Sequence, residues 1–358
     1  MDRTPVGQVA GPDRLLWLTD DGELRAHYYR RRGPGRLKWS RPPSVGMHET
    51  RRAILEAIAD GPVSGPDLAE TLEISRAAVW KHVDELREAG FEIESGPGGY
   101  ELLEVGTYNG EAVEFGLEAP FDVEYHDSIG STNDRARELA TEGAADVAVL
   151  ADEQVGGRGR LEREWTAPSG GVWVSIVNRP TVAPAQAPLF TLAASVATAR
   201  AAREAGVDAR IKWPNDVVVP LDDEGAYRKL AGILTEMEGE TDRVEWLVVG
   251  IGVNANIDAD DLPETATSIR EEAGDVDRRL FVQRLLEAFD DLRSDLESVV
   301  PAWRDLSLTL GQRVRVDRPA GEVVGEAVSI TDSGALEVET DDGHVMVSAG
   351  DCEHLRPV

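Results

Sequence analysis

The sequence of 358 residues is poor in cysteine and has no long apolar stretch. Its single cysteine, Cys352, excludes an intramolecular disulfide and the multi-cysteine patterns of zinc sites, and its place near the end makes it a poor candidate for a catalytic nucleophile. The six histidines show no ligand spacing, so we expect no metal site built by the protein. Because there is neither a signal peptide nor an apolar run that could span a bilayer, we expect a cytoplasmic protein without a membrane partner.

Basic residues are also scarce, since 37 Lys and Arg stand against 67 Asp and Glu, which gives a net charge of −30 and a pI near 4.5. The acidic residues are spread through the chain and are not gathered in a tail. This pattern is typical of halophilic proteins, whose dense carboxylates maintain hydration while salt screens their repulsion. An unusually acidic protein from an ordinary cell is the alternative. Either origin disfavours non-specific adhesion to nucleic acid.

Two nucleotide-binding motifs can be set aside. No Gly-x-x-x-x-Gly-Lys-Ser/Thr sequence occurs, so ATP is not held by a Walker-type loop. The segment Gly250-Ile-Gly-Val-Asn-Ala255 fits the dinucleotide fingerprint and follows an apolar run. That fingerprint also needs a helix that begins at the glycines, and the residues up to Pro263 form a poor helix. We therefore expect no nicotinamide site.

The most informative segments are Lys212-Trp-Pro-Asn-Asp216 and Gly156-Gly-Arg-Gly-Arg160. Lys212 follows an apolar residue and precedes a Pro-Asn turn, so its ammonium is expected at the end of a strand. A fixed, partly desolvated charge suits an anion that changes during a reaction, such as a carboxylate that becomes an acyl phosphate. The glycines of the other segment allow close approach to a ligand, and its arginines bind phosphate oxygens. Taken singly, the first segment is more often a plain strand and turn, and the second a solvated loop.

In this order, these segments and several others resemble those of the biotin protein ligases, in particular the bifunctional biotin ligase/biotin operon repressors. The resemblance covers residues 48–358 and implies a multidomain α+β protein whose central, class II synthetase-like domain is built on a mixed sheet. The matching segments are Ser131-Thr-Asn133, Gln154, Gly156 to Arg160, Trp165, Pro168-Ser-Gly-Gly171, Trp173, Ser175, Lys212 to Asp216, Lys229-Leu-Ala-Gly-Ile-Leu234 and Gly250-Ile-Gly-Val-Asn254.

The resemblance implies two acyl transfers in one site. The carboxylate of biotin attacks the α-phosphate of ATP, which releases pyrophosphate and leaves biotinyl-5′-adenylate. A lysine amine of the biotin carrier domain of a biotin-dependent carboxylase then attacks the mixed anhydride, and AMP leaves. Both steps need charge neutralisation, positioning and exclusion of water, with Mg²⁺ accompanying ATP, but neither needs a protein nucleophile. The lack of a usable cysteine and of any Ser–His arrangement agrees with this scheme.

Residue types suggest roles within this scheme, and the resemblance implies the same assignments. Lys212 is expected against the carboxylate and the α-phosphate, where its charge stabilises the transition state. Arg158 and Arg160, with Gly157 and Gly159, are expected in a loop that closes over the adenylate. The ureido head group of biotin is assigned to the polar side chains of Ser131, Thr132, Asn133 and Gln154, and the apolar parts of the ligands to Trp165.

Three further residues each have two interpretations. Trp173 covers an apolar part of a ligand or belongs to the core. Asn215 and Asp216 form the turn that aims Lys212, or they contact Mg²⁺.

The segment after Arg160 departs from the pattern of the family, which often has a glycine two residues after this arginine. Here Leu161-Glu162 stands in that place, and the extra negative charge near a phosphate is unfavourable unless it is screened or paired.

Residues 1–46 and 48–104 predict two different kinds of segment. Residues 1–46 have nine Lys and Arg against five Asp and Glu, and we interpret them as a disordered extension upstream of a start at Met47. A basic arm that touches DNA is the alternative.

Residues 48–104 predict a winged helix-turn-helix, with helices at 50–60 and 66–72, a third helix capped by Ser75, and a hairpin at 91–103.

In a helix-turn-helix the third helix enters the major groove, so the candidates to face operator DNA are Arg76, Lys81 and His82. Residues 48–104 hold five basic and thirteen acidic residues, and this net charge of −8 opposes phosphate contacts. Packing against the ligase domain is therefore the alternative role of this module, and a homodimer is left open.

Residues 108–303 predict the central domain and residues 306–358 a small SH3-like β-barrel. In the central domain, β-branched runs predict strands at 147–152, 172–177, 217–219 and 244–249, and apolar patterns predict helices at 188–205 and 278–300. In the C-terminal domain, turn residues separate predicted strands at 312–316, 323–330, 335–340 and 344–348.

Two other functions remain as alternatives. A lipoate-type ligase would share the fold and the adenylation chemistry, but the Gly-Arg loop together with the winged helix argues against it. A DNA-binding biotin sensor without ligase activity would keep the biotin-binding residues and would not need Lys212.

Overall fold

The computed structural model describes residues 47–106, 108–160, 165–221, 226–318 and 320–355, together with the backbone of two N-terminal strands. The chain divides into the units Met1–Pro43 and Ser44–Val358. In the first unit, β1 (Arg14–Leu18) pairs antiparallel with β2 (Leu24–Tyr28), regular structure that the sequence did not predict. The rest of this segment lies outside the described residues, so the hypothesis of a disordered extension upstream of Met47 stays a prediction.

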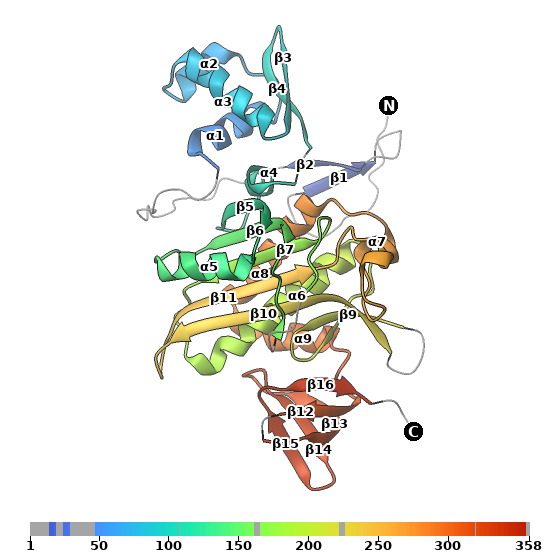
Figure 1. Ribbon diagram of the computed structural model, residues 1–358. Helices are drawn as coiled ribbons and strands as arrows, with labels where there is room; N and C mark the ends of the chain where they lie inside the picture. Colours follow the sequence, from blue (N-terminus) through green and yellow to red (C-terminus); the bar gives the residue numbers. More distant parts are fainter. Residues whose placement is uncertain are drawn as a thin grey trace. The chain divides into compact units, whose positions relative to one another are not determined.

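The second unit begins with the predicted helix-turn-helix and wing (Figure 1). Ser64 and Ser75 accept hydrogen bonds from the backbone N–H groups of Asp67 and Ala78, and these caps fix where two of the helices begin. The apolar faces of the helices and of the hairpin form their own core. The elements are α1 (Glu49–Ile58), α2 (Gly65–Thr71), α3 (Arg76–Glu88), β3 (Phe91–Gly96) and β4 (Gly99–Val105).

Glu114, in the short helix α4 (Gly110–Glu114), links this module to the central domain. Its buried carboxylate accepts hydrogen bonds from the N–H of Met47 at 2.9 Å and from Arg52 at 2.6 Å on one side. On the other side it accepts one from the N–H of Val123 at 2.6 Å. Burial raises the pKa of this carboxyl although all three donors favour its charged form. These contacts support a structural role for the module alongside any role in DNA binding.

The central domain is a seven-stranded mixed sheet with strand order β5-β6-β7-β11-β10-β9-β8, in which β5 and β6 are parallel and all other neighbours antiparallel. Its strands are β5 (Asp122–Ile129), β6 (Val147–Gln154), β7 (Val172–Asn178), β8 (Arg210–Lys212), β9 (Asp216–Pro220), β10 (Tyr227–Gly239) and β11 (Val244–Val253). The mixed sheet is confirmed, and Lys212 ends a strand, β8, as expected, while β5 and β10 were not predicted as strands.

Helices cover both faces of this sheet, which is why every residue of β7 is buried. The helix α5 (Thr132–Thr141) packs on one face against β6, β7 and β11, and its Ala136 and Leu139 meet Val149 and Val248. The Ala-rich α6 (Ala187–Glu204) contacts β8 to β11 on the other face and packs against α8 (Arg278–Ser294) and α9 (Val299–Leu306). The short α7 (Ile269–Ala273) precedes α8.

The predicted helix at 278–300 is wrong in one respect, because the helix ends at Ser294. Asp295 leaves the helical conformation with φ −134° and ψ 78°, and a short 3₁₀ turn leads into α9. A continuous helix would place Pro301 in its interior, where proline lacks a hydrogen-bond donor and clashes with the preceding turn. Starting a new helix at Val299 puts Pro301 in the first turn, where proline is tolerated.

The C-terminal domain is a five-stranded antiparallel sheet with strand order β15-β14-β13-β12-β16. Its strands are β12 (Arg313–Asp317), β13 (Val323–Ile330), β14 (Leu336–Thr340), β15 (Gly343–Val347) and β16 (Asp351–His354), the last of which was not predicted. Trp213 attaches this domain to the central one, because its N–H donates to Thr309 Oγ1 at 2.9 Å and its indole Nε1 to the carbonyl of Gly334 at 3.1 Å. None of the described helices is long and apolar enough to cross a membrane.

We predict that Trp213→Ala lowers the free energy of unfolding by about 3–5 kcal/mol, because the indole is 1% exposed and its removal leaves a cavity. Urea unfolding followed by circular dichroism measures this change. Trp80→Ala is the matched control, since that tryptophan is 58% exposed and its loss should change stability by less than about 0.5 kcal/mol. Equal effects of the two substitutions would contradict the role assigned to Trp213.

Candidate active site

A cavity of about 290 Å³ lies where the start of α5, the Gly-Arg loop and the strands β10 and β11 meet. Its wall brings together most of the residues that the sequence nominated, although they come from separate parts of the chain. The lining residues are Ser131, Thr132, Asn133, Gln154, Arg158, Gly159, Arg160, Trp165, Thr166, Asn215, Asp216, Lys229, Gly232, Ile233, Leu234, Gly250, Ile251, Gly252, Asn254, Leu262, Pro263, Thr265, Ala266 and Asp351.

Glycines of the two central strands allow large polar side chains to lie directly on the sheet. A Cβ atom at Gly250 would come within 2.1 Å of Asn133 Oδ1, and one at Gly252 within 3.0 Å of the indole nitrogen of Trp165. A Cβ at Gly232 would meet Trp165 at 3.2 Å. The Gly-x-Gly motif that looks like a dinucleotide fingerprint therefore serves close packing, and the cavity floor depends on it.

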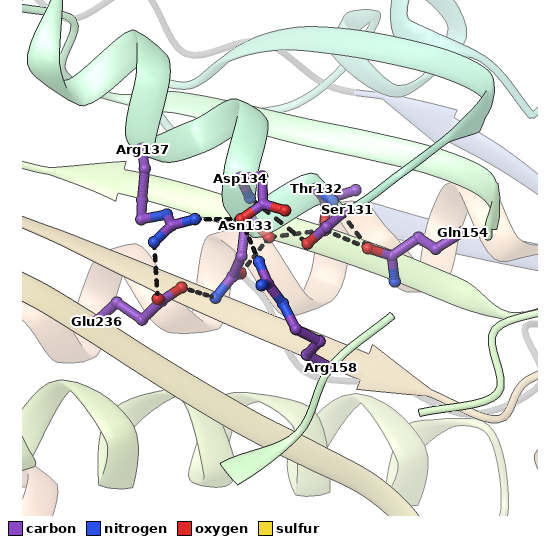
Figure 2. A network of polar contacts seen from close by, with 9 residues as sticks. Ser131, Thr132, Asn133, Asp134, Arg137, Gln154, Arg158 and Glu236 are labelled. Carbon is purple, nitrogen blue, oxygen red and sulfur yellow. Dashed lines mark hydrogen bonds and ion pairs between the residues drawn. The ribbon is translucent and has the colours of Figure 1, made fainter. Parts of the chain in front are cut away.

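The start of α5 holds a hydrogen-bonded cluster that fixes the nominated polar residues (Figure 2). The N–H and the hydroxyl of Thr132 donate to Gln154 Oε1 at 2.8 and 3.0 Å. Ser175 Oγ lies 2.7 Å from Thr132 Oγ1 and 2.6 Å from Asn133 Oδ1, and Ser131 caps the helix. Because both bonds from Thr132 occupy Gln154 Oε1, the Gln154 amide offers its Nε2 hydrogens to other acceptors.

The first arginine of the loop is tied to the same helix. Asp134 Oδ1 accepts hydrogen bonds from both Arg158 and Arg137, so one carboxylate holds two guanidinium groups (Figure 2). Glu236 Oε2 accepts from Asn133 at 2.7 Å, and its Oε1 lies 3.5 Å from Arg137. The loop thus reaches the cavity with its cation already paired to a residue of α5.

The second arginine of the loop bridges two domains. Arg160 donates to Asn215 Oδ1 at 2.9 Å and to the carbonyl of Gly350, just before β16, at 3.0 Å. Asn215 in turn donates to the carbonyl of Ile233 at 2.9 Å, so it fixes the turn and also receives the loop. The C-terminal domain therefore helps to hold the Gly-Arg loop, and its Asp351 lines the cavity.

Lys229, which the sequence left without a role, lines the cavity, whereas Lys212 does not. The Lys229 ammonium lies 2.7 Å from Asp216 Oδ1 and stands 5.0 Å from the centre of the Trp165 ring. Lys212 does end a strand, β8, as predicted, but its side chain is 9% exposed and is not part of the cavity wall. Strand-end position alone does not show which way a side chain points, whereas Gly232 three residues after Lys229 marks an open sheet surface.

Lys212 faces a buried group of side chains that includes part of β16. Its Nζ lies 3.8 Å from Asp216 Oδ2 and 5.5 Å from the centre of the Tyr227 ring, which packs edge-on against His354. Burial raises the pKa of Cys352 to about 11, while burial and the nearby Lys212 charge lower the pKa of His354 to about 4. Both groups are therefore neutral at pH 7.

The other residues that the sequence singled out, Gly157 and Trp173, do not line the cavity. A Cβ at Gly157 would meet the Trp165 carbonyl at 2.5 Å, so this glycine serves packing of the loop. Trp173 is fully buried and its Nε1 donates to the carbonyls of Asp152 and Pro168, which supports the core interpretation. The departure at Leu161-Glu162 lies outside the described residues.

The three residues on α3 that are expected to face DNA differ in their exposure to solvent. Arg76 and Lys81 are exposed, while His82 is partly buried with its Nδ1 3.2 Å from Glu85 and its ring stacked on His48. Trp80, which was not among the residues expected to face DNA, is 58% exposed on this helix. Exposure of an aromatic residue on a helix is not visible in composition or in spacing.

Comparisons with known proteins agree with this architecture. The model of the "Biotin/lipoate A/B protein ligase family" matches residues 125–254, that of the "Biotin protein ligase C terminal domain" residues 309–355, and that of an "HTH domain" residues 50–101. A solved structure, "Biotin protein ligase from Aquifex aeolicus in complex with biotin and ATP", shares the fold with a TM-score of 0.55 and 24% identity, over 66% of this chain and 99% of that chain.

The fold and the cationic cavity thus define a ligase of the biotin/lipoate class. The Bacillus subtilis "Bifunctional ligase/repressor BirA" is 36% identical over 309 residues, which cover 81% of this chain and 93% of that relative. The Escherichia coli protein of the same name is 31% identical over 293 residues, 78% of this chain and 88% of the relative. The chain belongs to the biotin protein ligase family, in its bifunctional form with an N-terminal helix-turn-helix domain.

We predict that His354 makes the protein less stable in acid. Its pKa of about 4 lies below the ordinary 6.5, so between these pH values the ring is protonated in the unfolded chain and neutral in the folded protein. The free energy of unfolding therefore keeps its full value above pH 6.5 and decreases by roughly 2–3 kcal/mol as the pH falls towards 4.

Urea unfolding between pH 7 and 4 tests this for the native protein and for His354→Gln, whose stability should fall less steeply. His344→Gln is the matched control, because His344 is half-exposed and lies at the surface of the same domain. Parallel pH curves for the native protein and His354→Gln would contradict the prediction.

Proposed function

We propose that this ligase joins biotin to ATP as biotinyl-5′-adenylate and then transfers the biotinyl group to a lysine of a carrier domain. The observation that carries the proposal is the cavity, whose wall presents Lys229, Arg158 and Arg160 but, among its described residues, no cysteine or histidine. Relatives support the carrier, since one from Mycobacterium tuberculosis, 34% identical over 241 residues (63% of this chain, 86% of the relative), is named a "Biotin--[acetyl-CoA-carboxylase] ligase".

In the first step a carboxylate oxygen of biotin forms a bond to the α-phosphorus of ATP, and pyrophosphate leaves with the bonding electrons. Two anions must approach each other, so their repulsion has to be cancelled before the bond forms. Lys229 provides a fixed ammonium on the cavity wall, and the two loop arginines provide planar donors for phosphate oxygens. We assign the carboxylate and α-phosphate to Lys212 and Lys229, whose ammonium groups both lie beside Asp216 of the cavity wall, and the phosphates to Arg158 and Arg160.

The polar cluster at the start of α5 suits the head group of biotin. Thr132 is bonded to Gln154, Asn133 is held by Ser175 and Glu236, and Ser131 caps α5, so little conformational entropy is lost when a ureido group binds. The cluster offers both donors and acceptors, which a ureido N–H/C=O pattern requires. Trp165 lies across the glycines of the sheet and can cover the apolar part of a ligand.

In the second step the lysine amine of the carrier attacks the acyl carbon, and AMP leaves. This step needs a positioned adenylate and a protected anhydride, which the Gly-Arg loop supplies when it lies over the ligand. No covalent intermediate with the protein is required. The anchors of the loop, Asp134, Asn215 and Gly350, then determine how easily it opens.

Magnesium does not require a site built by the protein. In the part of the chain that the structure describes, no three His, Cys, Asp or Glu side chains come together as a metal site. Asp216 was the alternative ligand, but it already contacts two ammonium groups, and a cation would have to displace one of them. We propose that Mg²⁺ enters with ATP and is held by its phosphates, where it would neutralise charge.

The alternative functions have distinct signatures. A biotin sensor without ligase activity would not need three cations around one cavity. A lipoate-type ligase would need to accept lipoate, so competition between the two acids distinguishes the two ligases. Labelling of a purified biotin carrier domain, dependent on both biotin and ATP, is the direct test of the proposed function.

We predict that Lys229→Met slows adenylate formation a hundredfold or more, since a preorganised charge of this kind is worth about 3 kcal/mol in the transition state. Pyrophosphate release at saturating biotin and ATP measures the effect. Arg203→Met is the control, because Arg203 pairs with Asp208 at the exposed end of α6. A rate for Lys229→Met within a few-fold of the native protein would refute the role of Lys229.

We also propose that the winged helix-turn-helix represses transcription at an operator, as a homodimer that forms with biotinyl-adenylate. Support comes from the helix-turn-helix, from the exposed Arg76 and Lys81, and from relatives named as ligase/repressors. The domain carries a net charge of −8, so it can make few phosphate contacts.

We predict that operator binding depends weakly on salt. Each phosphate contact normally contributes a loss of affinity as salt rises, and a module with two exposed cations on α3 should show a shallow slope. Footprinting upstream of biotin genes, with adenylate present and at several salt concentrations, measures it. Absence of any protected site would leave the module with its structural role at Glu114 alone.

A further inference from the structure

Trp80 begins the second turn of α3 and is 58% exposed. Single apolar side chains are common on protein surfaces and by themselves indicate nothing. The position of Trp80 is informative, because α3 is the third helix of the helix-turn-helix, the element that such a motif places in the major groove of DNA. The inward side of this helix is already supplied by Val79, Val83 and Leu86, so the indole is not needed for the core.

Trp80 belongs to a small exposed surface on the first two turns of α3. Arg76 lies one turn before Trp80, and Ala77 lies one turn before Lys81, so the four side chains form two neighbouring rows along the helix. All four residues are exposed. A helix-turn-helix contacts base edges with this N-terminal part of its recognition helix, so the indole stands where bases are read.

The charges of α3 are divided along its length. Residues 76–83 contain no acidic residue, whereas Asp84, Glu85 and Glu88 follow in the second half. The Glu85 carboxylate lies 3.5 Å from the Lys81 ammonium and offsets part of its charge. The N-terminal half of α3 is therefore the part that an anionic duplex can approach, and the partial positive charge at the start of a helix favours the same end.

The DNA-binding module cannot obtain its affinity from phosphates alone. Residues 48–104 carry a net charge of −8, which opposes the sequence-independent attraction between a protein and DNA. Contacts with base edges must then supply a larger share of the binding free energy. The apolar group that base pairs present in the major groove is the C5-methyl of thymine. An indole suits this group, because it buries a large apolar area at the cost of only two rotatable bonds.

We propose that Trp80 is a specificity-determining residue of the DNA-binding module, and that its indole packs against thymine methyl groups in the major groove of the operator. Arg76 and Lys81 supply the polar contacts that hold α3 in the groove. This inference rests on the proposed repressor function, since it takes α3 as the helix that reads the operator.

The test uses duplexes that the full-length native protein selects from a random-sequence library in the presence of biotin and ATP. Trp80→Ala should bind the selected duplex roughly tenfold to a hundredfold more weakly. Its affinity for a scrambled duplex and its salt dependence should stay native, because no phosphate contact is lost. Trp80→Phe keeps an aromatic ring and should recover much of the affinity. Labelling of the carrier domain should be native in both variants, since Trp80 does not line the cavity.

Removal of methyl groups from the DNA tests the contact itself. Replacing one thymine of the selected duplex by uracil deletes a methyl group and leaves the hydrogen-bonding edge of the base unchanged. The native protein should lose affinity roughly three- to fivefold at one or more positions, as expected for one buried methyl group. Trp80→Ala should lose nothing further at those positions, because the partner of the methyl group is already absent.

Two control variants lie in the same domain. Leu103→Ala removes an apolar side chain that is 51% exposed on β4, and it should bind the selected duplex like the native protein. Lys81→Ala removes a cation beside Trp80, and it should weaken binding to the selected and the scrambled duplex equally, with a salt slope smaller by about one.

The outcomes distinguish this inference from the function on which it rests. Native affinity of Trp80→Ala for the selected duplex, or equal methyl effects in the two proteins, would overturn the inference and leave the repressor function standing. Failure of the native protein to select any sequence would overturn the repressor function, and the role of Trp80 with it.

A second copy of the chain is the other partner that an exposed indole could contact. Sedimentation without DNA measures the monomer–dimer equilibrium of the native protein and of Trp80→Ala. A weaker dimer in Trp80→Ala, together with equal methyl effects in the two proteins, would place the indole in an interface between copies and overturn the contact with thymine. An unchanged equilibrium together with the expected methyl effects would support that contact.

Discussion

Repulsion between like charges is the constraint on which the active site depends. A site that draws two anionic reactants together must gather cations around a cavity before any anion is present, and those cations repel one another. The protein meets this constraint with two carboxylates that each contact two cations: Asp134 holds Arg158 and Arg137, and Asp216 holds Lys229 and Lys212. In each case one cation lines the cavity and its companion stands outside the wall.

The central sheet makes room for these charged side chains because glycines leave part of its surface without side chains. Gly250 and Gly252 of β11 and Gly232 of β10 allow Asn133 and Trp165 to lie against the backbone. Any side chain at these positions would lift the start of α5 or the loop away from the strands. The helices on the two faces then bury both sides of the inner strands, so the backbone beneath the site has little freedom to move.

Local signals carried much of the fold but less of the site. Serine caps and apolar spacing located the three N-terminal helices, and β-branched runs located the inner strands, because these patterns act over a few residues. Strands with mixed exposure, such as β10, escaped notice, and Pro301 broke a helix whose apolar pattern continued. That Lys229 lines the cavity while Lys212 is buried depends on packing between distant segments, of Trp165 beside Lys229 and of Tyr227 and β16 beside Lys212.

The bond between Arg160 and the carbonyl of Gly350 has a consequence for biosynthesis. A ribosome delivers the loop, α5 and both lysines well before it delivers β16, so a growing chain already holds the cations while it lacks one anchor of the loop and the Asp351 wall. A reactive anhydride formed by such a chain would escape into solution. Placing the last anchor in the C-terminal domain ties retention of the intermediate to completion of the fold.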